Sequence, residues 1–362
     1  MSTLSKSIIR VALAGGIAAM SMFTANAQPK DMRFKVTEIM DPTGFEKPIV
    51  AATSVIPADW TTEGGIVWQM GMDCNKGFRT DWTATSADGE AMIRMLPQTS
   101  WRFNNQGMPV GQGCIPAAIN SADEYVQGFI GQLDSPQIVS VERDPATSEA
   151  LAKPPFTYEM QGDPYSKNWW DAASVTFDYK RDGKDYTAAM IVFSTHSYML
   201  SGHSFGFGQP LEAGYGAAVV QILIAAPKDQ IEDYVPAFML FLKNYRSNPE
   251  WDRRIQAYLE ASRPKNTPRQ PSASSVVSNT YDEISDITFN GWKKRNEITS
   301  SSPRETSEWI RGVETYNANT PSGQIELPQG YDRAFEMNDG SFVVTNDAFF
   351  ETLDGRELSV TQ

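Results

Sequence analysis

The sequence contains few of the residues on which most catalytic and metal sites depend. Its 362 residues include two histidines, His196 and His203, and two cysteines, Cys74 and Cys114. The histidines lack the helical i, i+4 spacing and the neighbouring carboxylates that metal sites favour. A phosphate-binding glycine loop is also missing. The sequence therefore indicates neither a metal site nor another cofactor.

Basic residues are outnumbered as well. The chain has 31 lysines and arginines against 44 aspartates and glutamates, so its formal net charge is −13. Nucleic-acid binding needs a concentrated basic surface to neutralise phosphates, and adhesion to anionic lipid depends on a similar excess. We therefore expect no nucleic-acid partner and no adhesion to an anionic membrane.

The hydrophobic run near the N-terminus is too short to make a good membrane span. This run covers residues 11–23. Lys6 and Arg10 precede it, and residues 25–27, which follow it, read Ala-Asn-Ala. This pattern predicts a signal peptide over residues 1–27, with a retained N-terminal anchor as the alternative. Cleavage removes two positive charges and changes the net charge from −13 to −15. We expect a periplasmic or secreted protein, without an integral membrane segment after cleavage, whose partner is an envelope protein or a small ligand.

The cysteine pair fits that compartment. Cys74 and Cys114 would both lie in an oxidising environment, and their spacing differs from the C-x-x-C of reactive or metal-binding pairs. We therefore predict a disulfide between them, which closes a loop of about 40 residues.

Strand-like segments joined by tight turns dominate the middle of the chain. Asp88-Gly89 and residues 181–184 mark two of these turns. Residues 216–227 form a continuous apolar run typical of a central strand. A capping box at Ser121–Glu124 predicts the start of one helix, and the apolar periodicity of residues 231–245 predicts another. The fold class predicted from this order is α+β, a largely antiparallel sheet with packed helices and a small C-terminal helical and hairpin unit.

The sequence also predicts how the chain is divided into segments. The segments are a signal peptide (1–27), an extended lead-in (28–47), an α+β domain with a trailing helix (48–263), a linker (264–276), and C-terminal helices with a β-hairpin (277–362). In the last segment, residues 281–298 and a helix opening at Ser302 are the expected helices, the second with Trp309, Val313 and Tyr316 as its apolar stripe. A hairpin is expected at residues 331–345.

One part of the chain has a familiar arrangement. A P-x-x-W turn at Pro57–Trp60, a sheet, a helix, more strands and a closing helix succeed one another. This order resembles the PsbP/DcrB-like fold over residues 48–248. The resemblance implies a non-catalytic binding or assembly module in an exported setting, and it supplies no catalytic residue.

The string GHSFG at residues 202–206 matches the G-x-S-x-G elbow that presents a serine nucleophile. The elbow requires a helix directly after Ser204, but glycines and Pro210 follow instead. No histidine occurs beyond His203, although that hydrolase class needs one downstream. A rearranged triad of Ser204 and His196, oriented by Asp185 or Glu212, is the alternative. We therefore expect a non-enzymatic protein, with a serine hydrolase as the alternative.

Aromatic side chains give the remaining indications of a binding surface. Trp169 and Trp170 are adjacent, and side chains of adjacent strand residues point to opposite faces, so one ring could be exposed to a sugar or a protein. Phe205 and Phe207 lie in a glycine-rich loop that is a second candidate contact surface. Carbohydrate binding is therefore a further alternative function.

Overall fold

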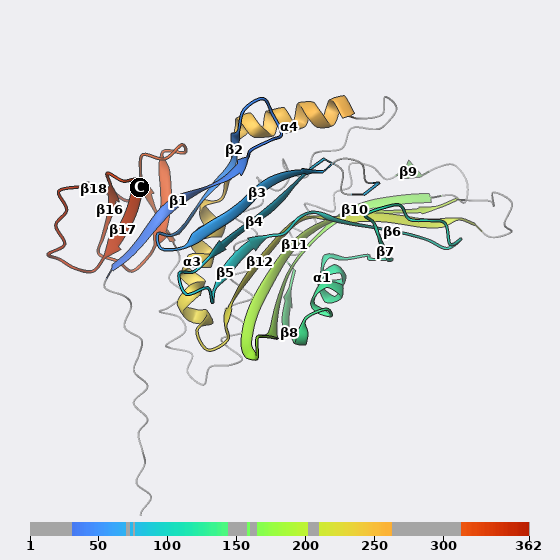
Figure 1. The fold of residues 1–362 in the computed structure, drawn as a ribbon, viewed down its shortest axis with the longest axis horizontal. Helices are drawn as coiled ribbons and strands as arrows, with labels where there is room; N and C mark the ends of the chain where they lie inside the picture. Colours follow the sequence, from blue (N-terminus) through green and yellow to red (C-terminus); the bar gives the residue numbers. More distant parts are fainter. Residues whose placement is uncertain are drawn as a thin grey trace, which may run out of the picture.

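The computed structural model of the protein describes residues 31–69, 73–74, 77–143, 158–159, 165–201, 210–262 and 313–361. Within these ranges the chain folds mainly into antiparallel β-strands, which three helices accompany (Figure 1). The helices are α1 (Ala122–Ile130), α3 (Ile231–Asn244) and α4 (Pro249–Ser262).

The larger sheet has ten strands, and most of them follow the order β3-β4-β5-β12-β11-β10-β8. Its strands are β3 (Thr61–Gln69), β4 (Gly77–Thr85), β5 (Met92–Met95), β6 (Thr99–Asn104), β7 (Ile115–Pro116), β8 (Asp134–Glu142), β9 (Tyr158–Glu159), β10 (Tyr165–Arg181), β11 (Lys184–Leu200) and β12 (Glu212–Pro227). Strand β6 continues the edge of β12 beyond β5, β7 pairs with β6, and β9 pairs with β10.

The smaller sheet has six strands in the order β13-β2-β1-β17-β16-β18. They are β1 (Asp31–Asp41), β2 (Ile49–Pro57), β13 (Arg246–Ser247), β16 (Arg333–Met337), β17 (Ser341–Thr345) and β18 (Gly355–Glu357). Strand β1 pairs with β17 in antiparallel register from Asp31↔Thr345 to Lys35↔Ser341, so the two ends of the described chain share one sheet (Figure 1). A separate pair is formed by β14 (Val313–Asn317) and β15 (Gln324–Pro328).

Three long strands form the centre of the larger sheet. Strands β10 and β11 have 17 residues each, and the turn between them is made by Asp182 and Gly183, with φ angles of 53° and 80°. Positive φ at both positions is the geometry of a two-residue hairpin turn, as the sequence predicts here. The predicted central strand at residues 216–227 is also confirmed, because β12 pairs with β11 on one edge and with β5 and β6 on the other.

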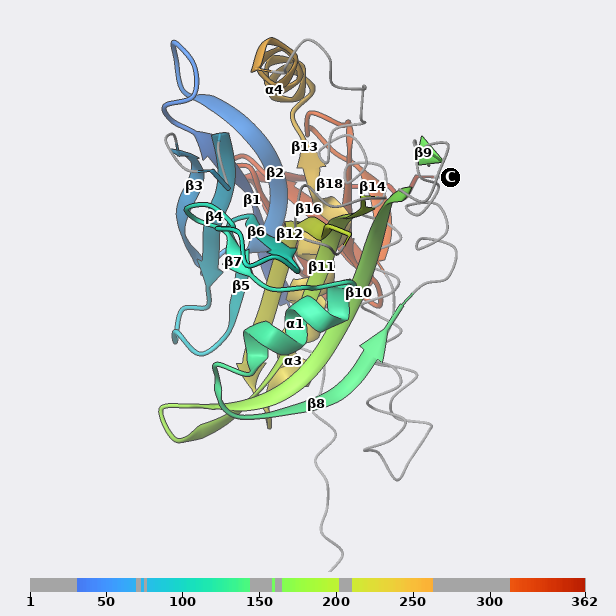
Figure 2. The ribbon, with the colours of Figure 1, turned by 90° about the vertical axis from the view of Figure 1, so that its right-hand side faces the viewer.

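The two faces of this sheet are covered by different elements. Side chains of α3, α4, β1 and β2 pack on one face, where Phe238, Trp82 and Ile222 belong to one buried cluster. Helix α1 lies across the other face (Figure 2). Its Val126 belongs to one buried cluster with Val175 of β10. The core is thus divided by the sheet into two apolar layers.

The predicted α+β class is wrong, since the described part is mainly β. The three helices have only 9, 14 and 14 residues, fewer than each of β10 and β11. Val313 and Tyr316, expected on one side of a helix, instead lie in strand β14, whose partner β15 is contributed by residues further along the chain. Strand pairing has overridden the local helical periodicity at this position. The C-terminal hairpin, in contrast, is confirmed by β16 and β17.

Several predicted segments lie outside the described residues. They are the signal peptide at 1–27, the linker at 264–276, the expected helix at 281–298, the start of the helix expected from Ser302 with Trp309, and the GHSFG loop with Ser204, Phe205 and Phe207. The division of the chain into domains stays a prediction. Within the described residues, none of the helices combines the length and the apolar character needed to cross a membrane.

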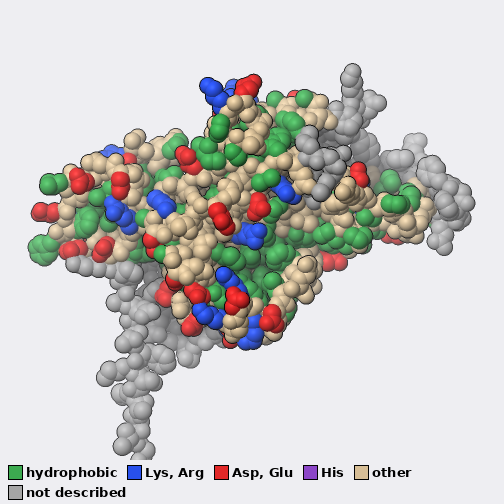
Figure 3. Space-filling model, in the orientation of Figure 1, with side chains coloured by type: hydrophobic (Ala, Val, Ile, Leu, Met, Phe, Trp, Pro, Cys, Tyr) green, Lys and Arg blue, Asp and Glu red, His purple; other side chains and the backbone are tan. Residues whose placement is uncertain are grey.

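Charged side chains of both signs are interspersed on the face of the molecule shown in Figure 3. Acidic and basic side chains alternate there with uncharged surface, and no broad basic area is seen on that face.

Candidate functional site

The larger sheet opens at the end of β5, the short strand between β4 and β12. Strand β5 pairs with Trp82–Thr85 of β4 and with Ile222–Ala225 of β12, and it stops at Met95. Strand β6 pairs with the same edge of β12, but only at residues 213–218. The Leu96 N–H still donates to the Gln221 carbonyl oxygen at 2.9 Å, so residues 219–220 of β12 and residues 77–81 of β4 border a gap in the part of the chain that the structure describes.

A cavity of about 120 Å³ lies at this gap. Its apolar lining comes from both sheets and from α4, and includes Ile39, Ile66, Phe78, Val219, Val220 and Trp251. Polar side chains are fewer: Arg79, Thr80, Gln98, Gln221 and Ser247. A concave, mostly apolar site with a small number of polar groups is typical of small-ligand sites.

Gln221 anchors the segment that crosses the gap. Its side chain is 2% exposed, its Nε2 donates to the Pro97 carbonyl oxygen at 2.7 Å, and its Oε1 accepts from the Tyr125 hydroxyl at 2.8 Å. Burial raises the pKa of Tyr125, so this hydroxyl stays protonated as a donor. One buried amide thus links the cavity wall to α1 on the opposite face of the sheet.

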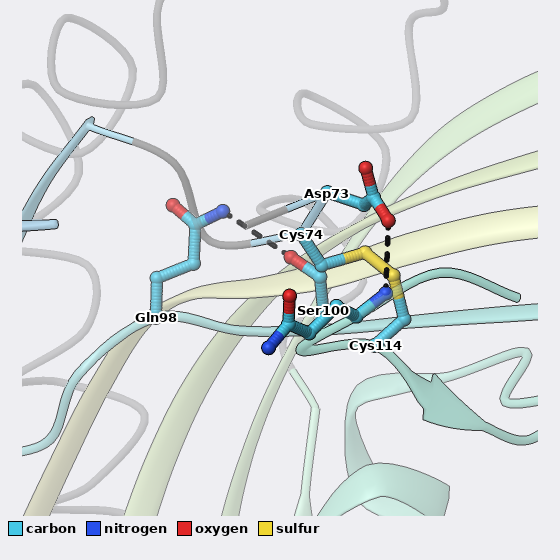
Figure 4. The surroundings of a disulfide bond; sticks show 6 residues. Asp73, Cys74, Gln98, Ser100 and Cys114 are labelled. Atoms are coloured by element: carbon cyan, nitrogen blue, oxygen red, sulfur yellow. Dashed lines mark hydrogen bonds between the residues drawn. A yellow bond between two sulfur atoms is a disulfide. The ribbon is translucent and has the colours of Figure 1, made fainter. Parts of the chain in front are cut away.

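The predicted disulfide lies beside the cavity wall. Cys74 and Cys114 are bonded, with a Cα–Cα distance of 5.2 Å. Figure 4 shows the bond near Gln98 and Ser100, where the chain passes from the gap into β6. The prediction of this disulfide is confirmed. It ties the connection after β3 to the connection before β7 and so fixes two surface segments next to the cavity.

His196 lies on the other face of the sheet, in a buried aromatic cluster. Its ring stacks on Trp169 at a centroid distance of 5.0 Å and an interplanar angle of 8°, and it lies 5.5 Å from the ring of Trp101. The side chain is only 3% exposed. Burial is the largest cause of a lowered His196 pKa, so the neutral imidazole is favoured.

The hydrogen bonds of His196 define its tautomer. Nδ1 lies 3.2 Å from the carbonyl oxygen of Ile119, which can only accept, so Nδ1 carries the proton. Nε2 then accepts from the Ser194 hydroxyl at 2.8 Å. Ser194 is itself fully buried. This serine–histidine pair is therefore a satisfied core contact without access for a substrate.

The groups proposed to assist Ser204 lie in other surroundings. Asp185 forms an ion pair with Lys180 at 2.8 Å, and Glu212 accepts from the Tyr198 hydroxyl at 2.9 Å. Neither carboxylate hydrogen-bonds to His196. Because Ser204 lies outside the described residues, the serine hydrolase hypothesis stays a prediction.

The two adjacent tryptophans point to opposite faces of β10. Trp169 is half-buried on the α1 face, where its indole N–H donates to the Asn120 carbonyl oxygen at 3.2 Å and the Lys167 amine lies over its ring. Trp170 packs against the cluster on the other face. Both rings thus contact other protein groups, and carbohydrate binding through them stays a prediction.

Sequence reasoning missed the cavity and its residues, above all Arg79 and Gln221. Pro97 was the available signal, because proline cannot donate to a sheet ladder and so ends the run of paired residues in β5. Which strands then border the gap depends on pairings that no local pattern encodes. In the described ranges, no group of three or more His, Cys, Asp or Glu side chains is arranged to hold a metal ion.

No protein-family model matches the chain, and no curated protein matches it. One solved structure to which it is similar is the crystal structure of LpqN, described as involved in cell envelope biogenesis of Mycobacterium tuberculosis. The alignment covers 59% of this chain and 92% of that chain, with 11% sequence identity and a TM-score of 0.25. At this TM-score the likeness defines neither the fold nor the function of the chain.

Proposed function

We propose that this chain is an exported, non-enzymatic binding protein of the bacterial envelope, and that it holds a small ligand in the cavity between β4 and β12. The cavity is the observation that carries the proposal. Apolar side chains that line a cavity have no protein atoms packed against them on that side, and a bound apolar group would supply such contacts. A ligand that enters it therefore gains both burial and contact.

Two features support export. Disulfides persist in oxidising compartments, and Cys74 and Cys114 form one here. Residues 1–27 have the charge and length pattern of a signal peptide. An envelope protein as an additional partner stays a prediction of the sequence.

The surroundings of His196 favour binding over catalysis. A general base must reach the proton that it removes, directly or through a water molecule. His196 is buried, and both of its ring nitrogens are hydrogen-bonded within the protein. Neither ring nitrogen of this imidazole is therefore free to take a proton from a substrate.

The test uses fluorobenzene, a neutral probe whose 19F NMR signal reports binding. We expect it to bind the mature protein, because an apolar cavity of about 150 Å³ holds benzene in another protein. Val219→Phe, which places a ring at the cavity wall, should weaken binding by about tenfold or more. Val141→Phe is the matched control, since Val141 lies on β8 and is 38% exposed. Equal binding by the wild type and Val219→Phe, or no binding by the wild type, would refute the proposal.

A further inference from the structure

Arg79 stands apart among the residues that line the cavity. It lies on β4 opposite Val67 of β3, and its Nε is buried without a hydrogen-bond partner. It is thus a cationic side chain at an otherwise mostly apolar site. The side chain as a whole is half-buried, but a donor such as this Nε that is removed from water costs free energy unless an acceptor compensates it.

The other arginines of the described ranges have such compensation. Of the eleven arginines there, nine form an ion pair with a carboxylate. Arg102 lies over the ring of Tyr215 at 5.4 Å. Arg79 has neither kind of partner, although acidic residues exceed basic ones in this chain, 44 to 31. Among the described arginines, Arg79 is therefore the exception, and it is the one that lines the cavity.

The chemistry of the guanidinium indicates which ligand group would pair with Arg79. Its planar donors match the two oxygens of a carboxylate, and charge-assisted hydrogen bonds of this kind are stronger than neutral ones. Thr80 and Ser247 line the same cavity and offer hydroxyl groups as further donors. Arg79 and Phe78 are adjacent on β4, so their side chains point to opposite faces of the strand. A ligand that extends through the gap would place an anionic head at Arg79 and an apolar body among Phe78, Val219 and Trp251.

We infer that the cavity binds a small organic anion, a carboxylate on an apolar body about the size of a benzene ring, with the carboxylate on the guanidinium of Arg79. The cavity volume of about 120 Å³ sets the size of the body. This inference rests on the proposed function and adds the chemical class of the ligand.

The experiment compares 4-fluorobenzoate with 4-fluorobenzyl alcohol, which has a similar size and no charge. Both are titrated into the mature protein at neutral pH and followed by 19F NMR. We expect the wild type to bind the carboxylate about tenfold or more tightly than the alcohol. In Arg79→Gln this preference should disappear, while the affinity for the alcohol changes by less than about twofold. Arg79→Lys should keep part of the preference, because the charge remains.

Arg102→Gln is the matched control, because it removes a cation that lies over Tyr215 instead of lining the cavity. It should leave the preference for the carboxylate unchanged. A wild type that binds both probes equally overturns the inference but leaves the proposed function intact, and so does a preference that survives in Arg79→Gln. A wild type that binds neither of these probes nor fluorobenzene overturns both. If Arg79→Gln fails to fold, the wild-type comparison and Arg79→Lys still decide the question.

Discussion

At the scale of single residues, the backbone carbonyl of Ile119 organises the aromatic cluster around His196. It accepts from the indole N–H of Trp101 at 3.1 Å and from Nδ1 of His196 at 3.2 Å. Trp101 also stacks on Tyr125 of α1 at 5.4 Å. One carbonyl thus aligns two buried rings, and each polar atom of those rings has a partner, as burial requires.

The buried histidine predicts a dependence of stability on pH. Burial lowers the His196 pKa below its ordinary value of 6.5. The unfolded chain therefore binds more protons than the folded chain below that pH, so the free energy of unfolding falls as the pH is lowered through about 6.5. We expect His196→Gln to flatten this fall, measured by urea unfolding at a series of pH values. His203→Gln, at the only other histidine, should keep it. Identical pH profiles for the wild type and His196→Gln would contradict the assignment.

Two glycines offer a matched pair of alanine substitutions. A Cβ at Gly216 would lie 2.4 Å from atoms of the Trp101 ring, whereas a Cβ at Gly128 in α1 would meet nothing within 4 Å. Gly216→Ala should lower the free energy of unfolding by about 1–3 kcal/mol through overpacking. Gly128→Ala should raise it by about 0.5–1 kcal/mol, because alanine favours the helix. Urea unfolding measures both. A neutral Gly216→Ala would mean that the ring can move away at no cost.

At the scale of elements, the position of the cavity depends on where strands end. Strand β12 is continuous, but its neighbour on one edge changes from β5 to β6, and the cavity lies at the change. Gln221 bridges the interval through its bond to the Pro97 carbonyl oxygen. The disulfide then holds the connections on the outer side, so the edges of the opening are fixed before any ligand arrives.

Removal of the disulfide tests this element directly. The bond joins residues 40 positions apart. In the chain-entropy model a loop of this length corresponds to about 3–4 kcal/mol, so Cys74→Ala/Cys114→Ala should be less stable by about that amount. Urea unfolding of the variant and of the oxidised wild type measures the difference. The reduced wild type serves as the control and should resemble the variant. A loss below about 1 kcal/mol would show that the connections hold their positions without the bond.

Local signals in the sequence predicted several elements correctly. The capping box places α1, since Ser121 Oγ accepts from the Glu124 N–H at 3.3 Å. The helix predicted over 231–245 is α3, which begins at Ile231 and includes Pro236. These features depend on neighbours a few residues apart. The pairing of β1 with β17, the strand state of Val313–Asn317 and the position of Arg79 depend on distant segments, and sequence patterns alone did not indicate them.

At the scale of the whole molecule, the expected signal peptide and the disulfide can be tested in one experiment. If residues 1–27 are a signal peptide, expression in a bacterium should give a periplasmic protein that begins at Gln28 and contains no free thiol. Intact-mass measurement with and without a thiol-labelling reagent checks both points. A variant with Ala25 and Ala27 changed to Leu is the control and should keep the leader. Retention of residues 1–27 in the wild type would favour the N-terminal anchor.

The pairing of β1 with β17 has a consequence for the order of events after synthesis. Arg33 of β1 donates to the Ser341 hydroxyl of β17, 308 positions later, so β1 is completed only after a long further stretch of chain has been made. Until β17 has been made, one edge of β1 exposes unpaired amides and carbonyls, which can associate with other extended chains. A polypeptide that is interrupted before residue 341 is therefore expected to be an aggregation hazard and a target for proteases.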